Sequence, residues 1–187
     1  MRKTVMPEAG LITADELLRH PEKYRRYELV NGHLVRRMTP VNPTHASVAG
    51  RLIVLLGSYA RDHRLGLVGP ELGVKLRSNP DTVLAPDVAF IRQERIPDRL
   101  PNGFWPGPAD LAIEVLSPDD RPADVRRKVA RYLEYGTQLV LVVDPYEQSV
   151  MVHGRDAEPL TYTSSEQVVS LDPVVPGFGF TLSDIFA

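Results

Sequence analysis

The chain has 187 residues, no cysteine and a formal net charge of −2. This length allows one domain to fold without disulfides or a structural metal, so we expect a single domain over residues 1–187 with a loose lead-in over 1–12. The absence of cysteine excludes a zinc–cysteine site and a thiol nucleophile, and the slight negative charge excludes a strongly basic nucleic-acid coat protein. Because no apolar run has the length of a membrane span or a signal peptide, we expect a cytoplasmic protein without membrane contact.

Local signals predict the first elements. Thr13 and Glu16 form a capping-box pattern, which predicts a short helix ending near Arg19. Asn31-Gly32 lies between two apolar stretches, 27–30 and 33–35, and predicts a hairpin with a type I′ turn. Asn42-Pro43 is a helix start, and the helix should reach about His63. Its predicted buried stripe consists of Ala49, Leu52, Ile53, Leu56, Tyr59 and Ala60.

Short strands and one more long helix are predicted for the rest of the chain. The helix covers about 123–135 and ends at Gly136, while residues 92–109 read as a polar, proline-rich loop. The apolar strand over 138–143 should be central, and those over 149–153 and 159–163 should lie at sheet edges. The apolar tail from Gly177 should pack back on the domain. The other predicted strands are 67–68, 73–76, 87–91 and 111–116, which gives an α/β (α+β) fold with a central mixed sheet flanked by helices.

Two of these strands carry an acid where burial would favour an apolar residue. Strand alternation places Asp87 on one face with Ala89, and Glu114 on one face with Ala112. The small alanine side chains leave space beside each carboxylate. The opposite faces should pack the core, and they carry Val88, Phe90, Leu111, Ile113 and Val115.

Such a pair of acids needs compensation. A carboxylate in an apolar strand is costly without a cation, and two of them on adjacent strands repel each other. A divalent metal resolves both problems, since Mg²⁺ accepts carboxylate oxygens together with water. Alternatively, each acid lies at a strand end, where it caps a loop or pairs with an arginine. The pair of Asp87 and Glu114, taken together with Lys128, favours the metal site.

Lys128 lies at the edge of the apolar stripe of the second long helix, beside Tyr132. A lysine in this position can extend its ammonium group into water. Because the helix follows directly after the strand that carries Glu114, the side chain can instead lean toward the sheet. An ammonium group there can orient a metal-bound water and stabilise negative charge on a phosphate.

Two further polar residues are candidates. Glu28 shares its strand face with Val30. His45 lies in the first turn of its helix, inside the apolar stripe, and is either a hydrogen-bonded core residue or part of a site near the helix N-terminus, where anions are favoured. We expect His45 to border the same cleft as Asp87.

With these residues in place, the chain resembles the PD-(D/E)XK nuclease superfamily, and most of all the prokaryotic Uma-two family of restriction-endonuclease-like proteins. The resemblance covers about residues 13–186. The ordered set of stretches is more specific than any of them alone. They are YELVNG at 27–32, His45 at a helix start, APDVAFI at 85–91, DLAIEVLSP at 110–118, the lysine in DVRRKVARYLEYG at 124–136, and LVLVVDP at 139–145.

The resemblance implies a restriction-endonuclease-like core and a phosphodiesterase site that uses Mg²⁺ or Mn²⁺. Asp87, Glu114 and the carbonyl of Val115 would hold the metal, and Lys128 would be catalytic. Glu28 matches the upstream acid of the family, and Glu28 or His45 could hold a second metal or a water. In the superfamily pattern the lysine stands two residues after the acid, where this chain has Leu116.

The function that follows is a metal-dependent endonuclease with DNA as its substrate. A catalytically weak or inactive nuclease-fold protein that binds nucleic acid or another partner is the alternative. A hydrolase that uses Asp87 and Glu114 as a metal-free acid/base pair would leave Lys128 without a role. By analogy with the superfamily we expect a homodimer. The arginines Arg126, Arg127 and Arg131 are either a phosphate-contacting edge or a solvated helix face.

Overall fold

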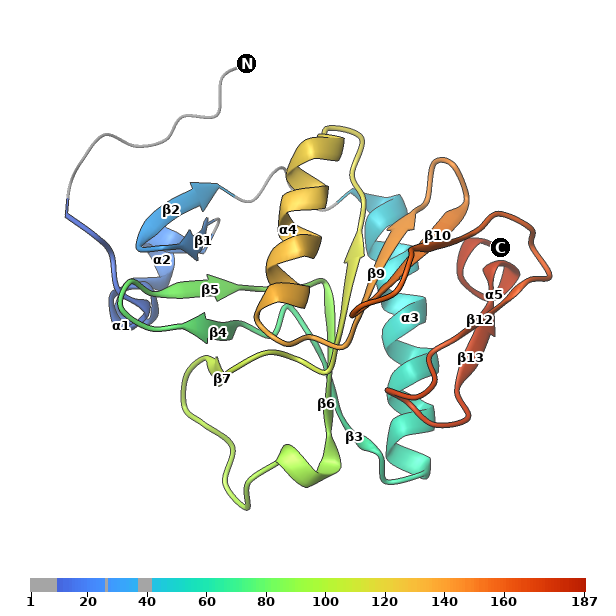
Figure 1. Ribbon diagram of the computed structural model, residues 1–187, viewed down its shortest axis with the longest axis horizontal. Coiled ribbons are helices and arrows are strands. Elements are labelled where there is room, and N and C mark those ends of the chain that lie inside the picture. Colours follow the sequence, from blue (N-terminus) through green and yellow to red (C-terminus); the bar gives the residue numbers. More distant parts are fainter. Residues whose placement is uncertain (1–9, 26, 37–41) are drawn as a thin grey trace.

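The computed structural model describes residues 10–25, 27–36 and 42–187 (Figure 1). Near its start, α1 (Ala14–Arg19) begins as predicted, with the Thr13 hydroxyl accepting a hydrogen bond from the Glu16 amide. A four-residue helix, α2 (Pro21–Tyr24), follows, which the sequence analysis did not predict. The hairpin of β1 (Tyr27–Val30) and β2 (His33–Arg36) is confirmed. Its turn residues Asn31 and Gly32 have φ angles of 50° and 75°, as a type I′ turn requires.

The long helix α3 (Pro43–Asp62) is capped by Asn42, whose side chain accepts a hydrogen bond from the amide of His45. The predicted stripe is confirmed, because its six residues are buried or pack against the core. No helix in the described part of the chain is both long and apolar enough to cross a membrane.

Within the described residues the strands form two larger sheets and a two-stranded ribbon, whereas one central sheet was predicted. Pro86 separates β5 from β6 and carries no amide hydrogen for a ladder, so the chain leaves one sheet there and enters the other. The five-stranded sheet has the order β2, β1, β5 (Thr82–Leu84), β4 (Val74–Arg77) and β7 (Trp105–Pro106). The six-stranded sheet has the order β11 (Leu160–Tyr162), β10 (Ser149–Gly154), β9 (Leu139–Asp144), β8 (Leu111–Val115), β6 (Val88–Arg92) and β3 (Gly66–Pro70).

Several predicted elements differ from those in the structure. The stretch 92–109 contains a 3₁₀ turn, η1 (Gln93–Arg95), and β7, so it is more ordered than a plain loop. The strand over 149–153 was predicted at an edge, which is wrong: β10 lies between β9 and β11. Its alternating exposure is typical of an edge, but β11 pairs along its open side. β9 is buried and central, as predicted.

The C-terminal segment packs on the domain, as predicted, and buries Phe178 and Phe180. It contains the ribbon of β12 (Val168–Ser170) and β13 (Gly179–Thr181), followed by α5 (Leu182–Phe186). α3 covers one face of the six-stranded sheet, and α4 (Pro122–Glu134) covers the opposite face (Figure 1). Gly136 follows α4 with a φ of 109°, which a non-glycine residue rarely adopts.

Candidate functional site

Asp87 and Glu114 lie side by side at one end of paired strands. β6 and β8 are antiparallel with Val88 opposite Ile113, so the next position of the same register brings Asp87 beside Glu114. The strand was predicted to begin at Asp87, but β6 begins at Val88, so Asp87 lies one residue outside the observed strand. Glu114 is on the α4 face, two residues after the fully buried Ala112, whereas the Asp87 carboxylate contacts His45 of α3. The predicted placement of the two acids on adjacent strands is therefore confirmed, and Ala89 and Ala112 are buried in the apolar cluster beneath α4.

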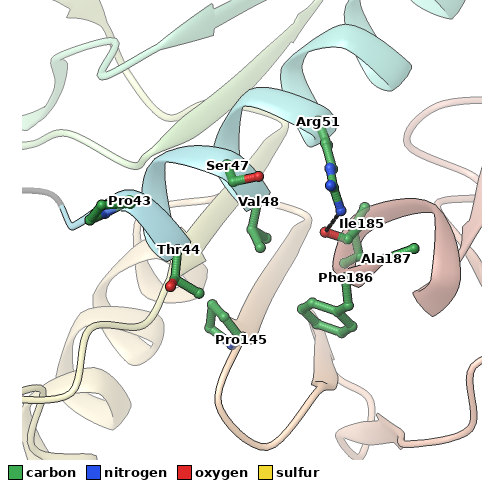
Figure 2. A pocket seen from close by; sticks show the side chains of 9 residues that line it. All are labelled: Pro43, Thr44, Ser47, Val48, Arg51, Pro145, Ile185, Phe186 and Ala187. Atoms are coloured by element: carbon green, nitrogen blue, oxygen red, sulfur yellow. Dashed lines mark hydrogen bonds between the residues drawn. The ribbon is translucent and has the colours of Figure 1, made fainter.

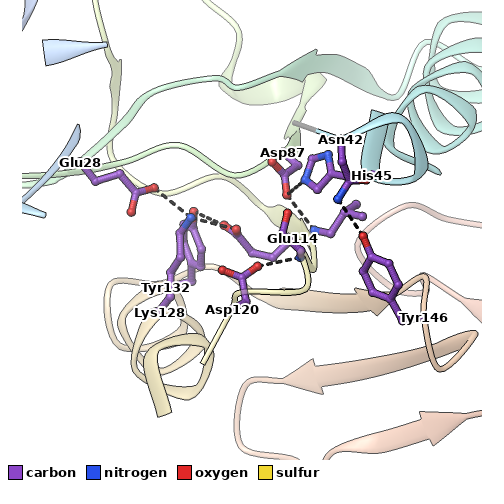
Figure 3. A network of polar contacts seen from close by, with 11 residues as sticks. Glu28, Asn42, His45, Asp87, Glu114, Asp120, Lys128, Tyr132 and Tyr146 are labelled. Atoms are coloured by element: carbon purple, nitrogen blue, oxygen red, sulfur yellow. Dashed lines mark hydrogen bonds and ion pairs between the residues drawn. The ribbon is translucent and has the colours of Figure 1, made fainter. Parts of the chain in front are cut away.

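The carboxylate of Asp87 is held from two sides (Figure 3). Its Oδ2 accepts a hydrogen bond of 2.7 Å from the Val115 amide and lies 3.2 Å from Nε2 of His45. Burial acts to raise the pKa of Asp87, but the His45 contact and the Val115 amide outweigh it, so the pKa lies below its usual range. The same contact is the main cause that raises the pKa of His45.

His45 thus borders the two acids, as expected from its sequence position. Asn42 fixes the helix start around it, because its Oδ1 caps the His45 amide at 2.9 Å and its Nδ2 donates to the Tyr146 hydroxyl at 2.8 Å. His45 is 7% exposed, and its Nδ1 has no hydrogen-bond partner within the described residues.

Both oxygens of the Glu114 carboxylate accept hydrogen bonds from α4. Lys128 Nζ lies 2.8 Å from Oε2, and the Tyr132 hydroxyl donates to Oε1 at 2.8 Å (Figure 3). Burial, helped by the negative charges of Asp87 and Glu28, raises the pKa of Glu114 to about 7, although the Lys128 ammonium acts in the opposite direction. The surroundings of Glu114 therefore favour its neutral form more than water does.

Lys128 joins the two larger sheets. Its Nζ also lies 2.9 Å from Oε1 of Glu28 on β1, and that oxygen accepts a hydrogen bond of 3.0 Å from the Ala85 amide. Burial opposes the charge of Lys128, but the carboxylates of Glu114 and Glu28 outweigh it and raise its pKa above the usual range. The ammonium group points toward the sheet, so the predicted proximity of Lys128 and Glu114 is confirmed and Glu28 belongs to the same cluster.

Two residues near the cluster were missed as site candidates. Tyr132 was assigned to the apolar stripe of its helix, and its ring is fully buried, but its hydroxyl contacts Glu114. Burial raises its pKa well above the usual range. Asp120 follows β8, accepts a hydrogen bond of 2.8 Å from the Ser117 amide, and has a pKa raised mainly by burial. The sequence did hold a signal for Tyr132, because it lies one helical turn after Lys128 and so on the same face of the helix.

The arginines of α4 lie outside this cluster. Arg126 and Arg127 are exposed and Arg131 is half-buried. Arg127 forms an ion pair with Asp124 on the same helix.

The oxygen atoms of Asp87 and Glu114 fit Mg²⁺, which keeps several water ligands, better than a metal ion that needs three or four side-chain ligands. In residues 10–25, 27–36 and 42–187, no three His, Cys, Asp or Glu side chains converge as ready ligands. Mg²⁺ is usually bound through one or two carboxylates and keeps several waters, so Asp87, Glu114 and one backbone carbonyl suffice in number. Because Lys128 and Tyr132 occupy one lone pair on each Glu114 oxygen, a second lone pair stays on each for a metal.

The described cavities lie elsewhere. One of about 330 Å³ opens between the first turns of α3, the turn after β9 and α5 (Figure 2). Thr44, Ser47 and Arg51 line it, and Arg51 donates a hydrogen bond to the Ile185 carbonyl at 3.2 Å. None of the six predicted site residues lines this cavity. The candidate site is therefore a partly buried polar network.

Comparisons with known proteins agree with this arrangement. The profile of the Uma2 family, described as “Putative restriction endonuclease”, matches residues 14–183. The crystal structure of “a putative nuclease belonging to DUF820” from Anabaena variabilis ATCC 29413 is similar, with 26% sequence identity and a TM-score of 0.80. The match covers 94% of this chain and 97% of that chain. The comparison with curated proteins finds no match.

Proposed function

The chain belongs to the Uma2 family of restriction-endonuclease-like proteins, and on this premise we propose that it is a metal-dependent endonuclease that hydrolyses phosphodiester bonds in DNA. The observation that carries the proposal is the side-by-side placement of Asp87 and Glu114 beneath Lys128. Two carboxylates and an ammonium group are the charges needed to hold a divalent cation and to face a phosphate. Family membership and the similar nuclease fold support the same assignment.

Asp87, Glu114 and the Val115 carbonyl would hold Mg²⁺ or Mn²⁺. When bound, the metal supplies a polarised phosphate and a water of lowered pKa. The Val115 amide and His45 hold Asp87, which keeps its carboxylate ionised and in place. His45 therefore acts on the proposed site through Asp87.

Lys128 is the proposed catalytic cation. Its ammonium group would orient the attacking water or stabilise the charge that develops on the phosphate. Glu28 also holds the ammonium group, and its Oε1 is fixed in turn by a hydrogen bond from the Ala85 amide. This arrangement supplies from a helix the charge that Leu116 cannot supply from the strand.

Cleavage of plasmid DNA tests the proposal. The purified chain should nick or cut the plasmid in Mg²⁺ or Mn²⁺ and lose this activity in a chelator. Asp87→Asn and Glu114→Gln should abolish it. Asp62→Asn is the control, because Asp62 is an exposed acid about 25 Å further along α3 than His45. DNA binding without any metal-dependent cleavage would overturn the proposal and favour the nuclease-fold binding module.

Cytoplasmic location and homodimer formation stay predictions. Size-exclusion chromatography with light scattering would measure the second. The choice of DNA over RNA is tested by offering both polymers in the same cleavage assay.

A further inference from the structure

Tyr132 makes a contact that packing alone does not need. Its ring is fully buried among apolar side chains of the α4 face, yet its hydroxyl donates to Glu114 Oε1 at 2.8 Å. A phenylalanine would fill the same space. The hydroxyl group is therefore explained by its hydrogen bond to the Glu114 carboxylate, since a buried tyrosine hydroxyl usually has a hydrogen-bond partner.

The contact completes a pair. Lys128 and Tyr132 lie four residues apart on one face of α4, and each contacts a different oxygen of Glu114 (Figure 3). The terminal torsion of a glutamate is soft, so one contact would leave the carboxylate plane free to turn. Two donors on two oxygens fix it, and α4 is itself held in the core by the buried Val129.

We propose that Tyr132 is a positioning residue of the nuclease site, which fixes the orientation of the Glu114 carboxylate for divalent-metal binding. The inference rests on the proposed function. Carboxylates that bind metals are themselves held by hydrogen bonds, and loss of such a partner typically costs 10–100-fold in metal affinity or activity. In this chain the residue that orients the acid comes from the same helix as the lysine, so α4 supplies both.

Tyr132→Phe tests this role, because it removes one oxygen and keeps the ring. Mn²⁺ affinity is measured by calorimetry, cleavage at saturating Mn²⁺ on plasmid DNA, and the folded state by thermal melting. We expect about a tenfold weaker Mn²⁺ affinity and about a tenfold slower cleavage. Tyr24→Phe is the matched control: the Tyr24 ring is also buried and its hydroxyl donates to Glu16 at 3.0 Å, in the separate apolar cluster that contains Leu29. It should leave both metal affinity and cleavage unchanged.

The outcomes separate this inference from the proposed function. If the parent chain binds Mn²⁺ and cleaves, and Tyr132→Phe does so equally well while only its melting temperature falls, Tyr132 is a packing residue and the inference is wrong. If the Tyr24→Phe control loses as much affinity as Tyr132→Phe, the effect is general and the inference is also wrong. If the parent chain neither binds Mn²⁺ nor cleaves, the proposed function fails and this inference falls with it.

Discussion

The two faces of strands β6 and β8 differ in the side chains that they carry. On the α3 face, alternate residues such as Phe90 and Ile113 are large, apolar and almost completely buried. On the α4 face, these strands carry the buried Ala89, Ile91 and Ala112, and Glu114 follows on the same face of β8. The α3 face of these strands is apolar throughout, whereas the α4 face combines apolar packing with a charged group at the end of the strands.

The difference shows how a sheet can hold a costly site. Buried carboxylates are tolerated only when cations and hydrogen-bond donors compensate them. Lys128 and Tyr132 of α4 compensate Glu114, and His45 in the first turn of α3 compensates Asp87, whereas the apolar residues on the α3 face need no such partner. Substitutions on the apolar face should therefore reduce stability and spare metal binding, while those on the polar face should change metal binding and pH dependence.

The largest loss of stability is expected for Phe90→Ala. Truncating this fully buried ring should lower the free energy of unfolding by about 3–5 kcal/mol. Urea denaturation measures this change. The Mn²⁺ affinity of the folded protein, measured at low temperature, should equal that of the parent chain. A variant that keeps its stability but loses metal binding would contradict the division between the two faces.

Lys128→Met should have the next largest effect. The methionine keeps the apolar stem but leaves Glu28 and Glu114 without their shared cation, at a cost of about 2–3 kcal/mol without metal. Cleavage should fall by about 10²-fold or more.

The control is Lys75→Met, which breaks the ion pair of Lys75 with Asp81 in the five-stranded sheet. Mn²⁺ binds only the folded site, so it stabilises both variants. Because Mn²⁺ takes over the role of the missing ammonium in Lys128→Met, it should raise the melting temperature of that variant more than that of Lys75→Met. Equal rises in the two variants, or an unchanged cleavage rate in Lys128→Met, would sink the assignment of Lys128.

Glu114→Gln should abolish cleavage, but at a given pH it should have the smallest effect on stability of the three variants, visible as a pH dependence. The pKa of Glu114 rises from 4.5 to about 7 on folding, so between these values the folded chain binds more protons than the unfolded chain. Without metal, the parent should therefore lose stability relative to Glu114→Gln as the pH rises from 4.5 to 7, by about 1 kcal/mol per pH unit. The pKa shift of His45 is present in both proteins and largely cancels in the difference. A difference that is flat across this range would show that Glu114 is ionised throughout.

Much of the fold follows from local signals. The Asn31-Gly32 turn, the Asn42 cap and the apolar stripe of α3 were predicted because each depends on residues close in sequence. The family predicted from the ordered motifs is confirmed by the profile match. The contact between Lys128 and Glu114 was also foreseen, since the helix follows directly after the strand.

The rest depends on contacts between distant segments. The division into two sheets was not predicted, because the signal at Pro86 shows where a ladder ends and not which strands pair afterwards. The contact of Glu28 with Lys128 joins residues 100 positions apart and has no local signal. Tyr132 was predicted as a core residue, and its ring is indeed buried in the core. Helical periodicity does not show which partner the hydroxyl group contacts.

A crystal structure of the chain soaked in Mn²⁺ tests the central claim most directly, because anomalous scattering locates the ion independently of activity. The account predicts one strong peak between the carboxylates of Asp87 and Glu114, with Lys128 and Tyr132 still near Glu114, and no peak in crystals of Asp87→Asn. A structure at full Mn²⁺ exposure with no ion at these carboxylates, or with an ion bound only elsewhere, would contradict it.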